Sequence, residues 1–188
     1  GKDKLRPFLD EATLAHNIEG LKKSFRKFLK FGDGANDAVM VDNWDWFKDI
    51  NYLAFLRDIG TCYSVNRMLT MDSVKSRLER EQPMSFLEFN YMLLQGYDFC
   101  QLLQKYNCRA QIAGADQWGN ITSGTELGRR RYDTELFGFT SPILTDSSGK
   151  KMGKSEGNAV WINDEKLPSY DYYQYFRNIG DSEVGKCL

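Results

Sequence analysis

The spacing of apolar residues along the chain predicts several helices. Between residues 10 and 30, apolar side chains recur every three or four positions, which is the period of an amphipathic helix. They are Leu14, Ile18, Leu21, Phe25, Phe28 and Leu29. A similar pattern closed by Gly60 predicts a helix over 49–59, and a more polar one predicts a helix over 72–81. The short apolar run 38–41 predicts a buried strand.

The longest predicted helix follows Ser85 and ends near Tyr106. Ser85 and Glu88 have the spacing of a capping box, which marks a helix start. Polar side chains recur along this apolar helix at positions i, i+4 and i+7, so they share one face. They are Tyr91, Gln95 and Asp98. Buried polar groups need hydrogen-bond partners, which could be neighbouring backbone groups or a small polar ligand.

A buried parallel strand, a tight turn and a helix are predicted in the next segment. The strand and turn cover 108–117, the helix covers 122–131, and a second strand covers 139–145. In parallel sheets, ligands bind beyond the carboxyl ends of strands, where Gly114 could admit a sugar and Asp116 could accept from ribose hydroxyls. Gly and Asp at a strand end are also common in ordinary turns.

Residues 151–155 read Lys-Met-Gly-Lys-Ser and follow a predicted turn. Two ammonium groups three residues apart on a loop could close over a nucleotide triphosphate and stabilise its developing charge. Short lysine-rich runs are also common as solvated surface. Residues 149–155 resemble a P-loop, but the spacing is one residue too short and 158–162 reads as extended rather than helical. We therefore reject the P-loop interpretation.

Composition favours one globular unit in a reducing, aqueous compartment. The chain has 188 residues, 41% of them hydrophobic, and a net charge of -1. With 25 basic and 26 acidic residues, any attraction to nucleic acid must come from local patches. The four cysteines lack zinc-site spacing and are interpreted as reduced thiols. No apolar run reaches the roughly 20 residues of a membrane span, and the first residues lack a signal-like apolar region.

Three motifs, taken in order and at their separations, resemble the tyrosyl-tRNA synthetases of the bacterial and organellar type. They are 91–98 (Tyr-Met-Leu-Leu-Gln-Gly-Tyr-Asp), 111–120 (Gln-Ile-Ala-Gly-Ala-Asp-Gln-Trp-Gly-Asn) and 151–155. The likeness runs over essentially the whole chain. It implies a class I aminoacyl-tRNA synthetase with an α/β fold, namely a Rossmann-like doubly wound parallel sheet with a helical connective insert. Its expected activity is to convert L-tyrosine and ATP to tyrosyl-adenylate and to transfer the tyrosine to tRNA(Tyr).

The resemblance also implies how the amino acid is bound. Asp98 would pair with the phenol of the substrate, and Tyr91 and Gln95 would hold its α-ammonium group. Gln111 would line the pocket, and Gln117 would contact the reacting carboxyl group. A carboxylate at the pocket floor is satisfied by a phenol and is left unpaired by phenylalanine.

Nucleotide binding is implied by the same resemblance. Gly114 and Asp116 would hold the ribose of ATP. The residues expected to act on the phosphates are Lys151, Lys154 and Ser155 in the signature loop, and Lys2 and Arg6 in a second phosphate loop at the amino end. Mg²⁺ would arrive with ATP and be bound by phosphate oxygens and water, so no protein ligand is assigned to a metal.

Several features differ from the family pattern. Gly153 replaces the usual central serine of the signature loop, and the His-x-Gly-His signature is absent. The single histidine, His16, is interpreted as a surface or packing residue. The chain is therefore expected to be a fragment. Residues 1–145 would form a partial catalytic domain with its connective and dimerisation region, and 146–188 the signature loop and the start of the helical anticodon-binding domain.

The expected partners are L-tyrosine, ATP, tRNA(Tyr) and a second copy of the chain, with no membrane. Residues 40–90 would correspond to the subunit interface of the homodimer. The expected location is cytoplasmic, with a mitochondrial or plastid matrix as the alternative. Three other functions stay open: a tryptophanyl-tRNA synthetase, a non-catalytic RNA-binding protein that assists intron folding, and a fragment that only dimerises.

Overall fold

The computed structural model describes residues 9–143, 145, 160–181 and 184–185. These residues fall into two compact units. One unit combines residues within 1–42 and 153–188, and the other consists of residues 43–152. The domain boundary predicted between residues 145 and 146 adjoins residues outside the described ranges, so it stays a prediction.

The first unit contains helices α1 (Glu11–Phe25) and α8 (Ser169–Arg177). Helix α1 begins where Asp10 accepts a hydrogen bond from the backbone N–H of Thr13 at 2.8 Å. The helix predicted over 10–30 is thus confirmed in type, and it ends five residues earlier than expected. None of the residues of α1 is buried.

The strand predicted over 38–41 is wrong. Only one isolated bridge forms there, between Phe31 and Ala38, and none of the named strands covers these residues. The preceding segment is a turn, because the carboxylate of Asp37 accepts from the backbone N–H of Gly34 at 3.0 Å and pairs with Lys30 at 2.9 Å. The polar groups of this segment bond to one another within the turn, so the strand pairing does not extend beyond one residue.

Ion pairs join α1 to a turn at residues 162–167. Lys23 pairs with Glu165 at 2.6 Å, and Lys27 contacts both Asp164 and the carbonyl oxygen of Ile162. The turn is stabilised locally, because the side-chain oxygen of Asn163 accepts from the backbone N–H of Glu165 at 2.9 Å. Consecutive carboxylates on the turn thereby meet two lysines, one in the last turn of α1 and one just beyond its end.

Helix α6 (Phe86–Tyr106) is the centre of the second unit. The predicted capping box is confirmed, since the side chain of Ser85 accepts from the N–H of Glu88 at 3.2 Å and Glu88 accepts from the N–H of Ser85 at 2.9 Å. Glu88 also pairs with Arg77 at 2.9 Å. The helix ends at Asn107, which adopts the left-handed conformation that asparagine tolerates.

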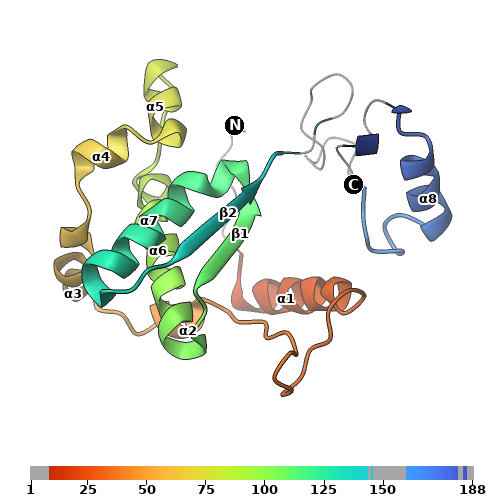
Figure 1. Ribbon diagram of the computed structural model, residues 1–188, viewed down its shortest axis with the longest axis horizontal. Coiled ribbons are helices and arrows are strands. Elements are labelled where there is room, and N and C mark those ends of the chain that lie inside the picture. Colours follow the sequence, from red (N-terminus) through yellow and green to blue (C-terminus); the bar gives the residue numbers. More distant parts are fainter. Residues whose placement is uncertain (1–8, 144, 146–159, 182–183, 186–188) are drawn as a thin grey trace. The chain divides into compact units, whose positions relative to one another are not determined.

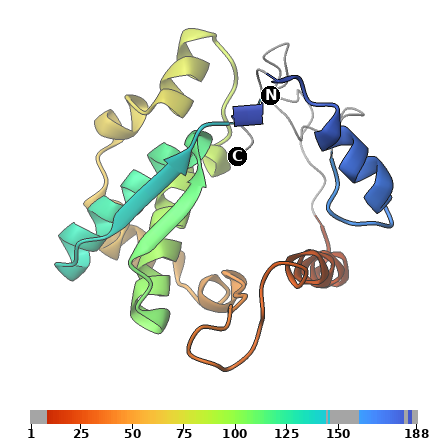
Figure 2. The same ribbon diagram turned by 45° about the vertical axis from the view of Figure 1, so that its right-hand side comes forward.

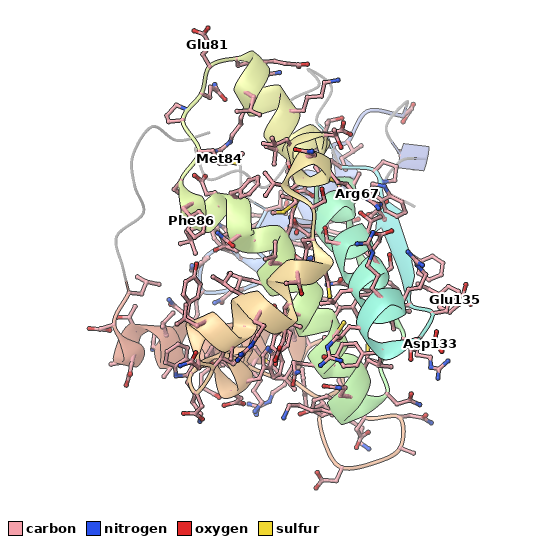
Figure 3. All side chains as sticks on the ribbon, turned by 90° about the vertical axis from the view of Figure 1, so that its left-hand side faces the viewer. Arg67, Glu81, Met84, Phe86, Asp133 and Glu135 are labelled. Atoms are coloured by element: carbon pink, nitrogen blue, oxygen red, sulfur yellow. The ribbon has the colours of Figure 1, made fainter. Side chains whose placement is uncertain are left out.

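Short helices pack along α6 in two apolar clusters (Figure 1). They are α2 (Trp44–Phe47), α3 (Tyr52–Asp58), the 3-10 turn η1 (Gly60–Cys62), α4 (Val65–Leu69) and α5 (Asp72–Glu79). One cluster contains Phe55, Phe99 and Leu127, and the other contains Met68 and Met92. The helices predicted over 49–59 and 72–81 are confirmed with shorter bounds. Figure 3 shows Glu81 beyond the end of α5, where its left-handed backbone prevents the helix from continuing.

A parallel two-stranded sheet completes the unit. Strand β1 (Ala110–Gly114) pairs with β2 (Phe137–Ser141) in the register Gln111 to Gly138. Between them lie the 3-10 turn η2 (Ala115–Gln117) and helix α7 (Trp118–Tyr132), so the predicted β-to-α crossover is confirmed. Figures 1 and 2 show the two strands side by side, and α7 packs against both the sheet and α6. None of the helices in the described ranges is long and apolar enough to cross a membrane.

The prediction that β1 is a buried strand is wrong for one face of the sheet. Ile112 is 77% exposed, and Phe139 on β2 is 56% exposed. These side chains alternate with those that face α7, where a Cβ on Gly138 would overlap the side chain of Ile121. The outer face is uncovered because the described helices of this unit all pack on the other side.

Two glycines set the close approach of α6 and α7. A Cβ on Gly96 would overlap the hydroxyl of Tyr63 and lie 3.3 Å from the backbone nitrogen of Gly124. A Cβ on Gly124 would lie 2.9 Å from the ring of Phe99, which is fully buried. The hydroxyl of Tyr63 donates to the carbonyl oxygen of Ser123 at 3.1 Å, and burial raises the pKa of Tyr63. Side chains at these glycines would force the helices apart.

Gly124→Ala is therefore expected to lower the free energy of unfolding by about 1–3 kcal/mol, the usual effect of overpacking a core. The matched control is Gly20→Ala in α1, where a Cβ meets nothing within 4 Å. That change is expected to be neutral or to stabilise by up to about 1 kcal/mol, because alanine favours helices over glycine. Thermal and chemical unfolding measure both. Equal effects of the two substitutions would contradict the close approach.

Candidate functional site

Helix α6 places Tyr91, Gln95 and Asp98 along one face, as the sequence predicts. Their environments differ. Tyr91 is 53% exposed, whereas Gln95 and Asp98 are half-buried. The expectation that all three polar side chains are buried therefore fits only Gln95 and Asp98. Tyr91 lies near the amino end of α6, where its ring remains accessible to a ligand.

The carboxylate of Asp98 is held by two donors, one in α2 and one in the residue that precedes it. Its Oδ1 accepts from the indole Nε1 of Trp46 at 2.8 Å, and its Oδ2 accepts from Nδ2 of Asn43 at 3.2 Å. Helix α2 is kept in place by Phe47, whose ring lies 5.5 Å from that of Tyr97 on α6. Burial raises the pKa of Asp98 above its ordinary value, and the two hydrogen bonds offset part of that rise.

Asn43 and Trp46, which hold Asp98, had no role predicted from the sequence. They precede Asp98 by more than 50 positions, and no helical or strand spacing connects them to it. A chemical signal exists nonetheless. A tryptophan that packs in a protein usually finds an acceptor for its indole N–H, and Asp98 is an acceptor on a largely apolar helix.

A second polar network joins α6 to the start of α7. Nδ2 of Asn120 donates to Oε1 of Gln95 at 3.0 Å and to Oε1 of Gln117 at 3.2 Å. All three side chains are half-buried. The structure thus brings together two predicted binding residues, Gln95 and Gln117, and adds Asn120, to which the sequence gave no role.

Gln111 contributes an unsatisfied acceptor to β1. Its Oε1 is buried and, among the described residues, has no hydrogen-bond partner. The side chain lies on the face of the sheet that α7 covers, because it pairs in register with Gly138. Leaving a buried acceptor unpaired is unfavourable by about 1–3 kcal/mol. A ligand donor would remove this cost, which suits the binding role expected for Gln111.

The predicted ribose-binding residues lie at the carboxyl end of β1. Gly114 is the last residue of the strand, and Asp116 lies in the η2 turn that follows. A Cβ on Gly114 would lie 2.8 Å from Oδ1 of Asp116, so any larger residue would displace this carboxylate. Gln117 comes next and precedes the first residue of α7. The helix N-terminus carries partial positive charge and favours an anionic ligand at this edge.

The expected phosphate-binding residues cannot be placed. Lys2, Arg6, Lys151, Lys154 and Ser155 all lie outside the described residues. Within the described residues, no three His, Cys, Asp or Glu side chains gather in a group that could hold a metal ion. Of the expected site residues, the structure therefore places only those predicted to bind the amino acid and the ribose.

A small hollow elsewhere does not contain the site. It lies between α4 and α7, and Figure 3 shows Arg67 beside α7 there. Glu126 pairs with Arg67 at 2.8 Å and with Arg130 at 3.3 Å in its lining. None of the predicted binding residues lines this hollow. The candidate site rests instead on the polar networks around Asp98 and Asn120.

Comparison with known proteins agrees with the resemblance seen in the sequence. A family model described as class I tRNA synthetases (W and Y) matches residues 2–188. A tyrosine–tRNA ligase of Rickettsia massiliae is 58% identical over 97% of this chain and 44% of its own length. One of Cereibacter sphaeroides is 56% identical with the same coverage. The chain spans less than half the length of these curated relatives.

Solved structures confirm the predicted fold class. A C-terminally truncated mitochondrial tyrosyl-tRNA synthetase of Coccidioides posadasii superposes with a TM-score of 0.73 at 30% identity, covering 100% of this chain and 56% of that one. Its counterpart from Aspergillus nidulans gives a TM-score of 0.75 at 28% identity, covering 98% and 55%. The helices and small parallel sheet are thus part of the Rossmann-like catalytic-domain fold of class I synthetases.

The raised pKa of Asp98 predicts how stability depends on pH. The folded protein binds this proton more tightly than the unfolded chain does. Wild-type stability should therefore fall relative to that of Asp98→Asn as pH rises from the ordinary aspartate pKa through the folded pKa, and stay level above it. Chemical unfolding of both proteins across this pH range measures the difference.

Trp46→Phe provides a second check on the same carboxylate. It removes the 2.8 Å donor, so the pKa of Asp98 should rise further and the fall in stability should extend to higher pH. A stability difference between wild type and Asp98→Asn that grows in favour of wild type with rising pH would contradict the assignment.

Proposed function

This chain belongs to the family of class I tRNA synthetases for tryptophan and tyrosine, and we propose that it serves tyrosine–tRNA ligation as the tyrosine-activating region of a longer protein. Relatives named tyrosine–tRNA ligase, at 58% identity over nearly all of this chain, support the choice of tyrosine. The observation that carries the proposal is the half-buried carboxylate of Asp98, held by Trp46 and Asn43.

Asp98 suits a phenol for a physical reason. An ionised carboxylate has about four acceptor positions, and the described structure uses one on each oxygen. A tyrosine phenol can donate to a remaining position. Phenylalanine has no donor, so its ring would displace water from the carboxylate and give nothing in return. The site is thereby selective for a side chain that ends in a hydrogen-bond donor.

The proposed first reaction joins tyrosine to the nucleotide. An oxygen of the tyrosine carboxylate attacks the α-phosphorus of ATP, the bond from that phosphorus to the β-phosphate oxygen breaks, and pyrophosphate leaves. Tyrosyl-adenylate remains. Gln117 would hold the attacking carboxylate, and Gly114 and Asp116 would hold the ribose at the end of β1. No side-chain nucleophile is required, since the protein acts by positioning and charge stabilisation.

The phosphate side of the reaction is assigned from the sequence. Lys151, Lys154 and Ser155, with Lys2 and Arg6, would stabilise the charge that develops on the pyrophosphate. Mg²⁺ bound to ATP would neutralise part of the same charge through the phosphate oxygens. In the second reaction, a ribose hydroxyl at the 3′ end of tRNA(Tyr) attacks the carbonyl carbon of the adenylate, and AMP leaves.

We also propose that the protein acts as a homodimer in a cytoplasmic or organellar compartment. Exposed apolar side chains near the start of α6 support self-association. Phe86 is 69% exposed and Leu87 54%, and Figure 3 shows Phe86 beside Met84 at this end of the helix.

Phe86→Asp is expected to weaken association at least tenfold in sedimentation equilibrium, whereas Tyr106→Asp at the far end of α6 should not. Equal association of both variants would refute this interface.

Asp98→Asn tests the proposed activity. In the full-length gene product, it is expected to lower kcat/KM for tyrosine in ATP–pyrophosphate exchange by about 10- to 100-fold, the usual effect of removing a charged hydrogen-bond partner. Asp49→Asn is the matched control, because Asp49 is exposed and lies outside the site.

Lys154→Met should instead lower kcat with little change in KM for tyrosine, because the Lys154 ammonium group would act on the departing pyrophosphate.

The same assay separates the alternative functions. Exchange with tryptophan but not with tyrosine would identify a tryptophan enzyme. Silence of the wild-type protein with either amino acid, together with retained RNA binding, would favour the non-catalytic role. Exchange with tyrosine that Asp98→Asn leaves unchanged would show that this carboxylate does not select the substrate.

A further inference from the structure

Asn120 lies where the two proposed amino-acid contacts meet. It is in the first turn of α7, between Gln117 in the preceding turn and Gln95 on α6. Its single NH₂ group has two N–H donors, and each side-chain amide oxygen of the two glutamines accepts from this nitrogen, at 3.0 and 3.2 Å. One asparagine thus fixes two glutamines that are 22 residues apart in the sequence.

The close packing of α6 against α7 makes this arrangement possible. Gly96 is the residue after Gln95, and Gly124 is one helical turn beyond Asn120. Neither glycine carries a side chain, so the two helices can lie close together. A Cβ on Gly96 would be only 3.3 Å from the backbone nitrogen of Gly124. At this separation the short side chain of Asn120 reaches across to α6.

Fixing the oxygen of each glutamine also fixes its NH₂ group. A glutamine amide that is free to rotate presents its oxygen or its nitrogen to a ligand about equally well. With Oε1 of Gln117 held by Asn120, its Nε2 is oriented as a donor, and none of the described residues accepts from it. Oε1 of Gln95 keeps a second acceptor position beside the bond from Asn120.

We propose that Asn120 is a positioning residue for the amino-acid substrate. It orients Gln117 to donate to the substrate carboxylate, and it holds Gln95 beside it to accept from the ammonium group. This inference rests on the proposed function. Asn120 itself does not need to touch the substrate, since it acts through the two glutamines.

Asn120→Leu tests the proposal, because leucine has a similar size and no polar group. The full-length gene product is titrated with tyrosine and with tyramine, which keeps the phenol and the ammonium but lacks the carboxylate. The Kd for tyrosine is expected to rise about fivefold to tenfold more than the Kd for tyramine, in line with the usual weight of a neutral hydrogen bond. A general structural defect would weaken both ligands equally.

A double-mutant cycle separates action through Gln117 from any other effect. In a Gln117→Ala background, Asn120→Leu should cause no further selective loss of tyrosine binding, because the amide that it orients is gone. Asn90→Leu is the matched control. Asn90 lies on α6 and is half-buried, but its amide donates only to the carbonyl oxygen of Phe86 in its own helix.

The outcomes are distinct. Equal loss of tyrosine and tyramine, or no loss of either, would overturn the orientation of Gln117 by Asn120 while leaving the proposed function intact. An undiminished selective loss in the Gln117→Ala background would also overturn it. A wild-type protein that binds no tyrosine at all would overturn the proposed function and the role of Asn120 with it.

Discussion

The contact between α6 and α7 at Gly96 and Gly124 is the constraint on which the rest of the larger unit depends. It fixes the distance between the helix that carries the polar face and the helix that follows β1. The buried ring of Phe99 fills the space beside Gly124, and the hydroxyl of Tyr63 closes it above Gly96. A core this tightly packed transmits small changes, so the glycines would influence the proposed binding site without touching a ligand.

Selectivity and stability oppose each other at Asp98. Removing a carboxylate from water is unfavourable, and the bonds from Trp46 and Asn43 compensate for only part of that cost. A residue chosen for stability alone would be apolar at this position of a largely apolar helix. In the proposed function, this unfavourable burial would make the carboxylate depend on a substrate hydroxyl. Gln111, with its buried and unpaired oxygen, follows the same logic on a smaller scale.

The sequence predicts what is local and misses what is distant. Helical spacing and the Ser85 capping box located α6 and its polar face, because both signals lie within one turn or a few turns of chain. Asn43, Trp46 and Asn120 were missed as functional residues, because their roles arise only when separate elements pack together. The residues expected to bind the phosphates were assigned from the family resemblance. They lie outside the described residues, so their role stays a prediction.

The uncovered face of the β1–β2 sheet has a practical consequence for handling the chain. Ile112, Phe137 and Phe139 present an apolar strip beside strand edges that, in the described unit, have no further strand to pair with. Such surfaces tend to associate with one another, and sulfate or phosphate at high concentration strengthens this association. Solubility of the chain in isolation should therefore be governed by this strip more than by its nearly balanced charge. Dilute, low-salt buffers suit it better than the salting-out conditions that many purifications use.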